Sequence, residues 1–284
     1  MRAFTISNTY GAFGLTLALT SMFLAVFWLN ICTKAHAGGF DYADYSEFLA
    51  RYVVPQKQIQ GIMVNAVDYD AIQKDRETTG SFYERVIGQF AAFDPDTLQG
   101  RKAGIAFWIN AYNIGAIKMI MDHYPVESIR STAINWLKNP WNKKIMPVGG
   151  AKYSLGHIEH DILIAKYQEP LIHFAIVCAS LSCPDLSPQV YEADRLQEQL
   201  ERQARRFLQN EKKGLDIRRN QGVVFFSKIF RFDEKTFPNG AEDAIPLIAP
   251  FLENEDDADY LRSGKYKIAY LDYNWDLNTL RNAR

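Results

Sequence analysis

The segment 103–121, AGIAFWINAYNIGAIKMIM, is the part of the sequence that most restricts the fold. Apolar residues occupy almost every side of a helix drawn through it, so such a helix has to be buried all round. The sequence HYP at 123–125 ends it, because a residue before proline avoids the α region. We therefore predict a central core helix over 103–121, with the remaining chain packed around it.

Two asparagines interrupt this apolar helix. Asn110 and Asn113 are three residues apart and so lie on one face. A buried amide needs partners, since an unpaired one costs roughly 1–3 kcal/mol. One interpretation has them clamp the backbone of a neighbouring loop, and the other has one of them orient a histidine or donate to an oxyanion. The clamp is favoured.

The amino terminus contains no charge from residue 11 to residue 31, and Ala35-His36-Ala37 follows in the small-x-small pattern of a cleavage site. The run is long for a signal peptide and near the lower range for a bilayer span. We therefore expect residues 1–37 to be a signal peptide or an N-terminal membrane anchor. Either one makes the protein exported: periplasmic or secreted, or anchored in the membrane through residues 11–31.

Composition limits the classes of partner. The 284 residues are 48% hydrophobic and carry a formal net charge of −1, so nothing suggests a nucleic-acid partner or a disordered chain. The sequence has no phosphate-binding loop, no G-x-S-x-G, no H-E-x-x-H and no C-x-x-C. We assign no cofactor and no metal.

Local patterns mix helices with short strands. We expect helices at 45–53, 81–93, 103–121, 155–166 and 192–209, and in part of 241–252, with Ser81 and Ser154 as caps of the second and the fourth. We expect strands or hairpins at 63–69, 143–155, 173–180, 215–226 and 265–275, with a turn at Gly149-Gly150 in the second. This order favours an α+β fold: residues 38–284 form a single compact domain with a central helix, a short β-sheet and peripheral helices.

The stretch HFAIVCASLSCPDL, residues 173–186, carries both cysteines that remain after residues 1–37. Its continuous apolar run predicts a buried strand over 173–180, with Cys178 at the strand end and Cys183 after a turn. One cysteine could be a nucleophile activated by a histidine, or the pair could be a redox-active disulfide. A structural disulfide, or two small buried side chains, is the third interpretation, and the residues alone leave all three open.

Histidines lie on either side of this stretch. In GHIEHD, His157 and His160 could hold a metal with His173 or Asp161, or His160 could be a catalytic imidazole oriented by Glu159. A solvated or capping histidine pair is favoured over the metal. In a straight strand His173 would lie about 16 Å from Cys178 on the opposite face, which makes His160 the better partner for a thiol.

Several motifs in order resemble a widespread bacterial and eukaryotic family called domain of unknown function 547. They are AFWINAYNIGAI, HYP, YSLGHIEHDIL, HFAIVCASLSCPDL, SKIFRF and LDYNWDLN, within about residues 45–278. The matching positions are Phe107, Trp108, Asn110, Tyr112, Asn113, Glu159, His160, His173, Cys178, Ser180, Cys183 and Pro184. The chain has Gly156-His157 where members often carry acids, which moves attention from His157 to His160. The resemblance implies no reaction.

The polar candidates come from three separate apolar segments, so we expect them to meet in one pocket. They are Asn110, Asn113, Glu159, His160, His173, Cys178 and Cys183. The leading hypothesis is a thiol-dependent hydrolase or acyl transferase acting on an unidentified small molecule or peptide. One cysteine would attack, His160 or His173 would be the base, and Glu159 or an asparagine would orient that base. The alternative is a non-catalytic envelope binding or scaffold module with a structural disulfide.

Overall fold

The central helix α4, Arg101–Met121, confirms the helix predicted over 103–121. The structure is a computed structural model that describes Met1, residues 39–137 and residues 139–283; the expected signal or anchor lies outside the described residues. Nearly every residue of α4 beyond its first turn is buried. A Cβ at position 104 would lie only 2.0 Å from the Tyr167 hydroxyl, so glycine fits at this position and a larger residue does not.

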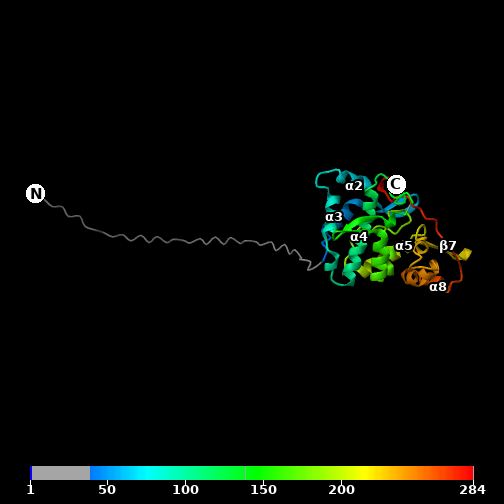
Figure 1. Ribbon diagram of the computed structural model, residues 1–284. Coiled ribbons are helices and arrows are strands. Elements are labelled where there is room, and N and C mark those ends of the chain that lie inside the picture. The colour runs from blue at the N-terminus through cyan, green and yellow to red at the C-terminus, as the bar shows by residue number, and fades with distance from the viewer. Residues whose placement is uncertain (2–38, 138, 284) are drawn as a thin grey trace. The chain divides into compact units, whose positions relative to one another are not determined.

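The other helices and the strands pack on α4 or beside it, with the C-terminal elements α8 and β7 at the side of the domain away from α4 (Figure 1). The α-helices are α1 Ala43–Tyr52, α2 Tyr69–Arg76, α3 Phe82–Ala92, α5 Leu196–Leu208, α6 Ile229–Phe232, α7 Ala241–Ile248 and α8 Glu255–Ser263. The strands are β1 Val53–Ile59, β2 Ile62–Val67, β3 Lys144–Val148, β4 Ala151–Ser154, β5 Leu215–Arg218, β6 Val223–Phe226 and β7 Lys267–Tyr270. Shorter helical segments are η1 Pro95–Thr97, η2 Pro140–Asn142, η3 His157–Lys166, η4 Pro170–Phe174, η5 Arg219–Gln221, η6 Ala249–Phe251 and η7 Leu280–Asn282.

The β-structure is divided among three small sheets, so the compact domain is α+β as predicted. Strands β1 and β2 pair antiparallel, as do β3 and β4, and β6 pairs antiparallel with β5 and parallel with β7. The predicted turn between β3 and β4 is confirmed at Gly149 and Gly150, whose φ angles of 56° and 77° suit glycine. The C-terminal segment then returns to β2, where the Val67 N–H donates to the Asn278 carbonyl at 2.8 Å.

The strand predicted over 173–180 is wrong. A 3₁₀ helix, η4, occupies Pro170–Phe174, and residues 175–180 are irregular apart from one isolated bridge from Ser180 to Leu277. The apolar run is buried, as a strand's would be, but within the described chain it has only this bridge and the Asn278 N–H, which donates to the Ala179 carbonyl at 3.0 Å, in place of a ladder. Burial on all sides produces the same sequence pattern in a strand and in a buried loop.

The two asparagines of α4 supply hydrogen bonds that a neighbouring strand would have given. Asn113 donates to the Ala175 carbonyl and accepts from the Val177 N–H, both at 3.0 Å. Asn110 bonds the Tyr191 backbone in the same two-point way, at 2.8 and 3.0 Å. Both side chains are 1% exposed. The backbone clamp favoured from the sequence is confirmed.

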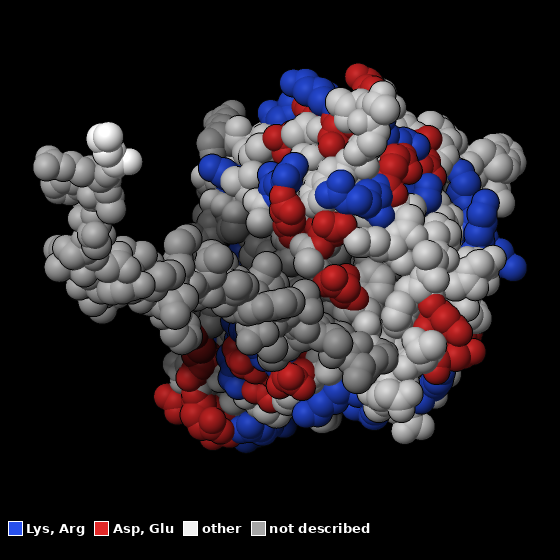
Figure 2. Space-filling model, turned by 90° about the vertical axis from the view of Figure 1, so that its left-hand side faces the viewer, with Lys and Arg blue, Asp and Glu red and all other residues white. Residues whose placement is uncertain are grey.

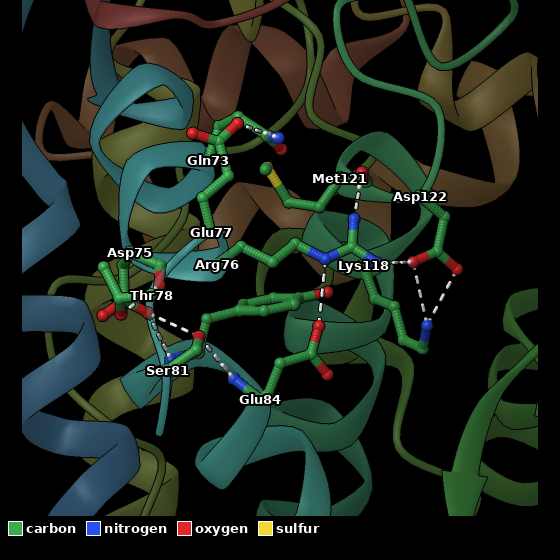
Figure 3. Close-up of polar contacts among 11 residues, drawn as sticks. Gln73, Asp75, Arg76, Glu77, Thr78, Ser81, Glu84, Lys118, Met121 and Asp122 are labelled. Atoms are coloured by element: carbon green, nitrogen blue, oxygen red, sulfur yellow. Dashed lines mark hydrogen bonds and ion pairs between the residues drawn. The ribbon is translucent and has the colours of Figure 1, made fainter.

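A polar cluster fastens α2 to the carboxyl end of α4 (Figure 3). Arg76 donates to the Met121 carbonyl at 2.6 Å and to Glu84 at 2.9 Å, and it also contacts Asp122 at 3.3 Å. A cation placed here satisfies a free carbonyl at a helix carboxyl end and complements the negative end of the helix dipole. The cluster fixes one end of the central helix.

At the start of α3, the Ser81 hydroxyl accepts from the Glu84 N–H at 3.2 Å, which confirms the predicted cap.

Basic and acidic side chains lie interspersed on the face shown in Figure 2. No helix among the described residues is both long and apolar enough to cross a membrane.

Replacing Asn113 with leucine should lower the free energy of unfolding by roughly 1–3 kcal/mol, because the Ala175 carbonyl and Val177 N–H lose their buried partners. Urea unfolding of the reduced protein measures the change. Gln209→Leu is the control, since Gln209 is an exposed amide at the end of α5. Equal stability of Asn113→Leu and wild type would show that the clamp contributes nothing.

Candidate active site

A cavity of about 600 Å³ opens where α4, η3, η4, the cysteine loop 175–184, α6 and the C-terminal segment meet. Five of the side chains predicted from the sequence line it: Glu159, His160, His173, Cys178 and Cys183. Asn110 and Asn113 are absent from its lining and act from behind, on the backbone of the loop. Trp141, Phe232 and Trp275 form much of the apolar wall, and the cation of Arg130 lies beside them.

Cys178 has several hydrogen-bonding groups around its sulfur. The Ser180 hydroxyl lies 3.1 Å from Cys178 Sγ and the Tyr273 hydroxyl 3.3 Å from it. Burial raises the pKa of this thiol, but hydrogen bonds from Cys183, Ser180 and Tyr273 lower it by more than burial raises it. The resulting pKa is about 7. The pKa of the Cys183 thiol is instead raised, by burial and by the neighbouring Cys178. Both are free thiols, and Cys178 is the one favoured as thiolate.

The turn after Cys178 has an unusual backbone. Ala179 has a φ of 58°, in the left-handed region that residues with a Cβ seldom adopt. This turn brings both the hydroxyl and the backbone N–H of Ser180 back to the Cys178 sulfur. Strain of this kind persists only where the surroundings hold it, and it gathers at functional sites. The two-point hold of Asn113 on the preceding residues is one such restraint.

His173 and Asp233 form a buried ion pair. His173 Nε2 lies 2.7 Å from Asp233 Oδ2, and Nδ1 lies 2.7 Å from the Pro170 carbonyl, which can only accept. Burial lowers the pKa of His173, but these two hydrogen bonds raise it more. The pKa of Asp233 is correspondingly held low, because hydrogen bonds from His173 and Thr236 outweigh burial. Both ring nitrogens of His173 are therefore engaged, and neither is available to Cys178.

Glu159 and His160 complete the polar wall. Glu159 accepts from the Tyr112 hydroxyl at 3.2 Å, and burial raises its pKa to about 7. His160 Nδ1 lies 3.9 Å from Asp233 Oδ1; it is buried and has no hydrogen-bond partner. Burial lowers the pKa of His160, which favours a neutral ring. Among the described residues, Glu159, His173 and Asp233 are the side chains grouped closely enough to hold a metal ion.

The helix η3 that carries these two residues is π-helical. The Tyr167 N–H bonds the Ile162 carbonyl five residues back, at 3.0 Å, and such windings are frequent at functional sites. Its amino end is held by Ser154, whose hydroxyl accepts from the His157 N–H at 3.2 Å, as predicted. His157 itself pairs with Asp161 at 2.8 Å, and both are about half exposed. His157 therefore pairs with Asp161 while His160 Nδ1 lies nearest Asp233, so the two rings do not form the paired metal ligands considered from the sequence, although both line a second cavity of about 350 Å³.

Residues 95–208 match the model of a family described as "Protein of unknown function, DUF547". This part of the chain is a DUF547 domain. It holds α4, η3, η4 and both cysteines, while Asp233 and Tyr273 lie beyond the matched range. No match to the chain is found among curated proteins or among solved structures.

Two residues of the site were missed by reasoning from the sequence, and one expected contact is not formed. Tyr273 lies in LDYNWDLN and Asp233 directly follows SKIFRF, so motifs outside the matched DUF547 range were the available signal. Within the described chain, no hydrogen bond joins either cysteine to His160 or His173. The hydrogen-bond partners of the Cys178 thiol are hydroxyl groups instead of an imidazole.

The reduced protein should react with iodoacetamide at Cys178 faster than at Cys183, with a rate that rises with pH about a midpoint near 7. Tyr273→Phe and Ser180→Ala each remove a donor to the thiolate, so each should raise that midpoint by roughly one unit and slow the reaction at neutral pH. Peptide mass spectrometry of timed samples gives both rates.

Tyr266→Phe is the matched control, since the Tyr266 hydroxyl bonds the Leu261 carbonyl, away from the cysteines. A midpoint at the free-thiol value of about 8.5, or equal rates at both cysteines, would contradict this account of the thiol.

Proposed function

We propose that the chain is a thiol-dependent hydrolase or acyl transferase whose nucleophile is Cys178. The observation that supports this most directly is the thiol itself. It lies in the wall of a large cavity, and hydroxyl groups on two segments hold its sulfur. The pKa of about 7 gives a substantial thiolate fraction at neutral pH without a neighbouring base.

In the proposed reaction the Cys178 thiolate attacks an acyl carbon. A sulfur–carbon bond forms and the carbonyl electron pair moves to oxygen. Collapse of this intermediate breaks the bond to the leaving group, which takes up a proton, and leaves a thioester on Cys178. Water or an acceptor nucleophile then attacks the thioester, releases the acyl group and restores the thiolate. The two outcomes are hydrolysis and acyl transfer.

His160 is the side chain that we place beside the leaving group. It lines the same cavity as Cys178 and is free of any cysteine contact, with Nδ1 lacking a partner. It can therefore bond a substrate without giving up an existing hydrogen bond. Asn110 and Asn113 have a positioning role, because their amides already bond the backbone around the cysteine loop.

The cavity wall suits a substrate with an apolar or planar part. Trp141 and Trp275 pack edge to face with ring centroids 5.9 Å apart, and Phe232 stacks on Trp275 at 5.6 Å. The Arg130 guanidinium covers Trp275 at 4.8 Å and adds a cation. Small acyl compounds and peptides both fit such a wall.

Treatment of the full chain with p-nitrophenyl acetate should place one acetyl group on Cys178 and release p-nitrophenolate. Cys178→Ala should abolish acetylation and Cys183→Ala should retain it. Intact-mass and peptide spectra identify the modified residue. His160→Ala should slow turnover while leaving alkylation of Cys178 unchanged, because no hydrogen bond joins the two.

His157→Ala is the matched control for His160→Ala, since His157 lies on the same helix but pairs with Asp161. Absence of acetylation, or acetylation that is equal in Cys178→Ala and wild type, would show that Cys178 is not the nucleophile. The non-catalytic envelope module would then be the better account.

We further propose that the protein is exported. The uncharged residues 11–31 and the sequence Ala35-His36-Ala37 support this. Amino-terminal sequencing of the protein from the cell envelope should give Gly38 if the signal is cleaved, whereas an intact Met1 in the membrane fraction would indicate an anchor. An intact protein in the cytosol would contradict export.

A further inference from the structure

We propose that Glu159, His173 and Asp233 form a binding site for a divalent transition-metal ion. One ligand atom from each residue lies within 4.8 Å of the other two, although the residues come from η3, η4 and the end of α6. One imidazole with two carboxylates suits ions such as Zn²⁺, Mn²⁺ and Fe²⁺. The site adds to the proposed thiol chemistry and does not depend on it.

The partners outside this cluster orient the three side chains as metal ligands. The Pro170 carbonyl holds His173 Nδ1 at 2.7 Å, which leaves Nε2 as the nitrogen that faces the carboxylates. The Tyr112 hydroxyl holds Glu159 at 3.2 Å. A ligating histidine in proteins almost always gives its other nitrogen to a carbonyl or carboxylate, and ligating carboxylates are hydrogen-bonded in turn.

Charge and proton balance fit a divalent ion. Two carboxylates and one neutral imidazole neutralise a 2+ ion, so the ion displaces the proton on His173 Nε2 and the proton of any Glu159 that is protonated, and both protons go to solvent. The existing 2.7 Å contact between His173 and Asp233 opens slightly to admit the ion. The cavity beside the cluster provides room for water or substrate at the remaining coordination positions.

An ion pair between His173 and Asp233 accounts for less of the arrangement around Asp233 than a bound metal ion does. It explains the contact between His173 and Asp233, but leaves His160 Nδ1 buried without a partner at 3.9 Å from Asp233 Oδ1. Unpartnered buried polar atoms are uncommon and costly. A water bound to an ion beside Asp233 can give this nitrogen a partner, so His160 is not needed as a ligand and keeps its place beside the substrate.

Equilibrium dialysis of the full, reduced chain against Zn²⁺, after treatment with a chelator, tests the site. We expect one ion per chain by metal analysis. Glu159→Gln and Asp233→Asn each remove a ligand charge and should weaken Zn²⁺ binding at least about 10-fold. His157→Gln and Asp161→Asn are matched controls on η3 and should bind as wild type does, because their side chains pair with each other and not with the cluster.

The double variant Cys178→Ala, Cys183→Ala separates this site from a thiolate zinc site. This variant should retain the ion although it cannot be acylated. Zinc binding by it would therefore support the metal site whether or not the proposed thiol chemistry is correct. No zinc on the wild type, full binding by Glu159→Gln and Asp233→Asn, or loss of zinc in the cysteine variant would each overturn the proposal.

Co²⁺ bound to the wild type gives an answer even where a ligand variant fails to fold. Sulfur ligation produces an intense thiolate-to-metal absorption band, and nitrogen and oxygen ligation does not. We expect the weak visible bands of bound Co²⁺ without the thiolate band. An intense thiolate band, or no bound Co²⁺, would contradict the site.

Discussion

The hydrogen bonds from two buried amides of α4 are the constraint on which the site depends. The loop 175–184 is as buried as a sheet strand, yet among the described residues it forms only one isolated bridge and a few backbone hydrogen bonds to residues 274–278. Asn113 holds the loop just before the cysteines, and Asn110 holds the chain after them at Tyr191. Arg76 in turn holds the carboxyl end of the helix. The cysteine loop is thus held on one side by α4 and on the other by the C-terminal segment, whose Asp276 and Asn274 carbonyls accept from Leu181 and Ser182.

Two kinds of electrostatic environment meet across the cavity. On one side, hydroxyl groups gather around the Cys178 sulfur and favour its charged form. On the other, His173 and Asp233 neutralise each other, while burial keeps the pKa of Glu159 high. The absence of a direct cysteine–histidine hydrogen bond separates thiolate formation from any proton transfer at His160.

Much of the fold follows from local chemistry. The apolar pattern of 103–121 required a buried helix, Ser81 and Ser154 capped helices as predicted, and Gly149-Gly150 turned a hairpin. The buried asparagines could be assigned to a clamp because an amide in an apolar helix must find partners. What could not be predicted depends on long-range contacts. The segment 173–180 has the composition of a strand. It is not a strand because no regular ladder pairs with it among the described residues, and the sequence of the segment does not reveal that.

The candidate site shows the same division. Five lining residues could be found because each stands out in its own segment. Tyr273 and Asp233 could not be assigned, since their roles arise from atoms more than fifty residues away in the chain. The separation expected between His173 and Cys178 assumed an extended strand, whereas His173 lies in the 3₁₀ helix η4.

The division of the site between the matched range and the C-terminal third has an evolutionary consequence. A descendant that kept residues 95–208 but exchanged the rest would retain the cysteine loop and its asparagine clamps. It would keep the Ser180 hydroxyl but lose the Tyr273 hydroxyl beside the sulfur and the Asp233 carboxylate beside His173, which later segments supply. Membership of the family can thus be inherited separately from reactivity, so two chains with the same central domain need not share a chemistry.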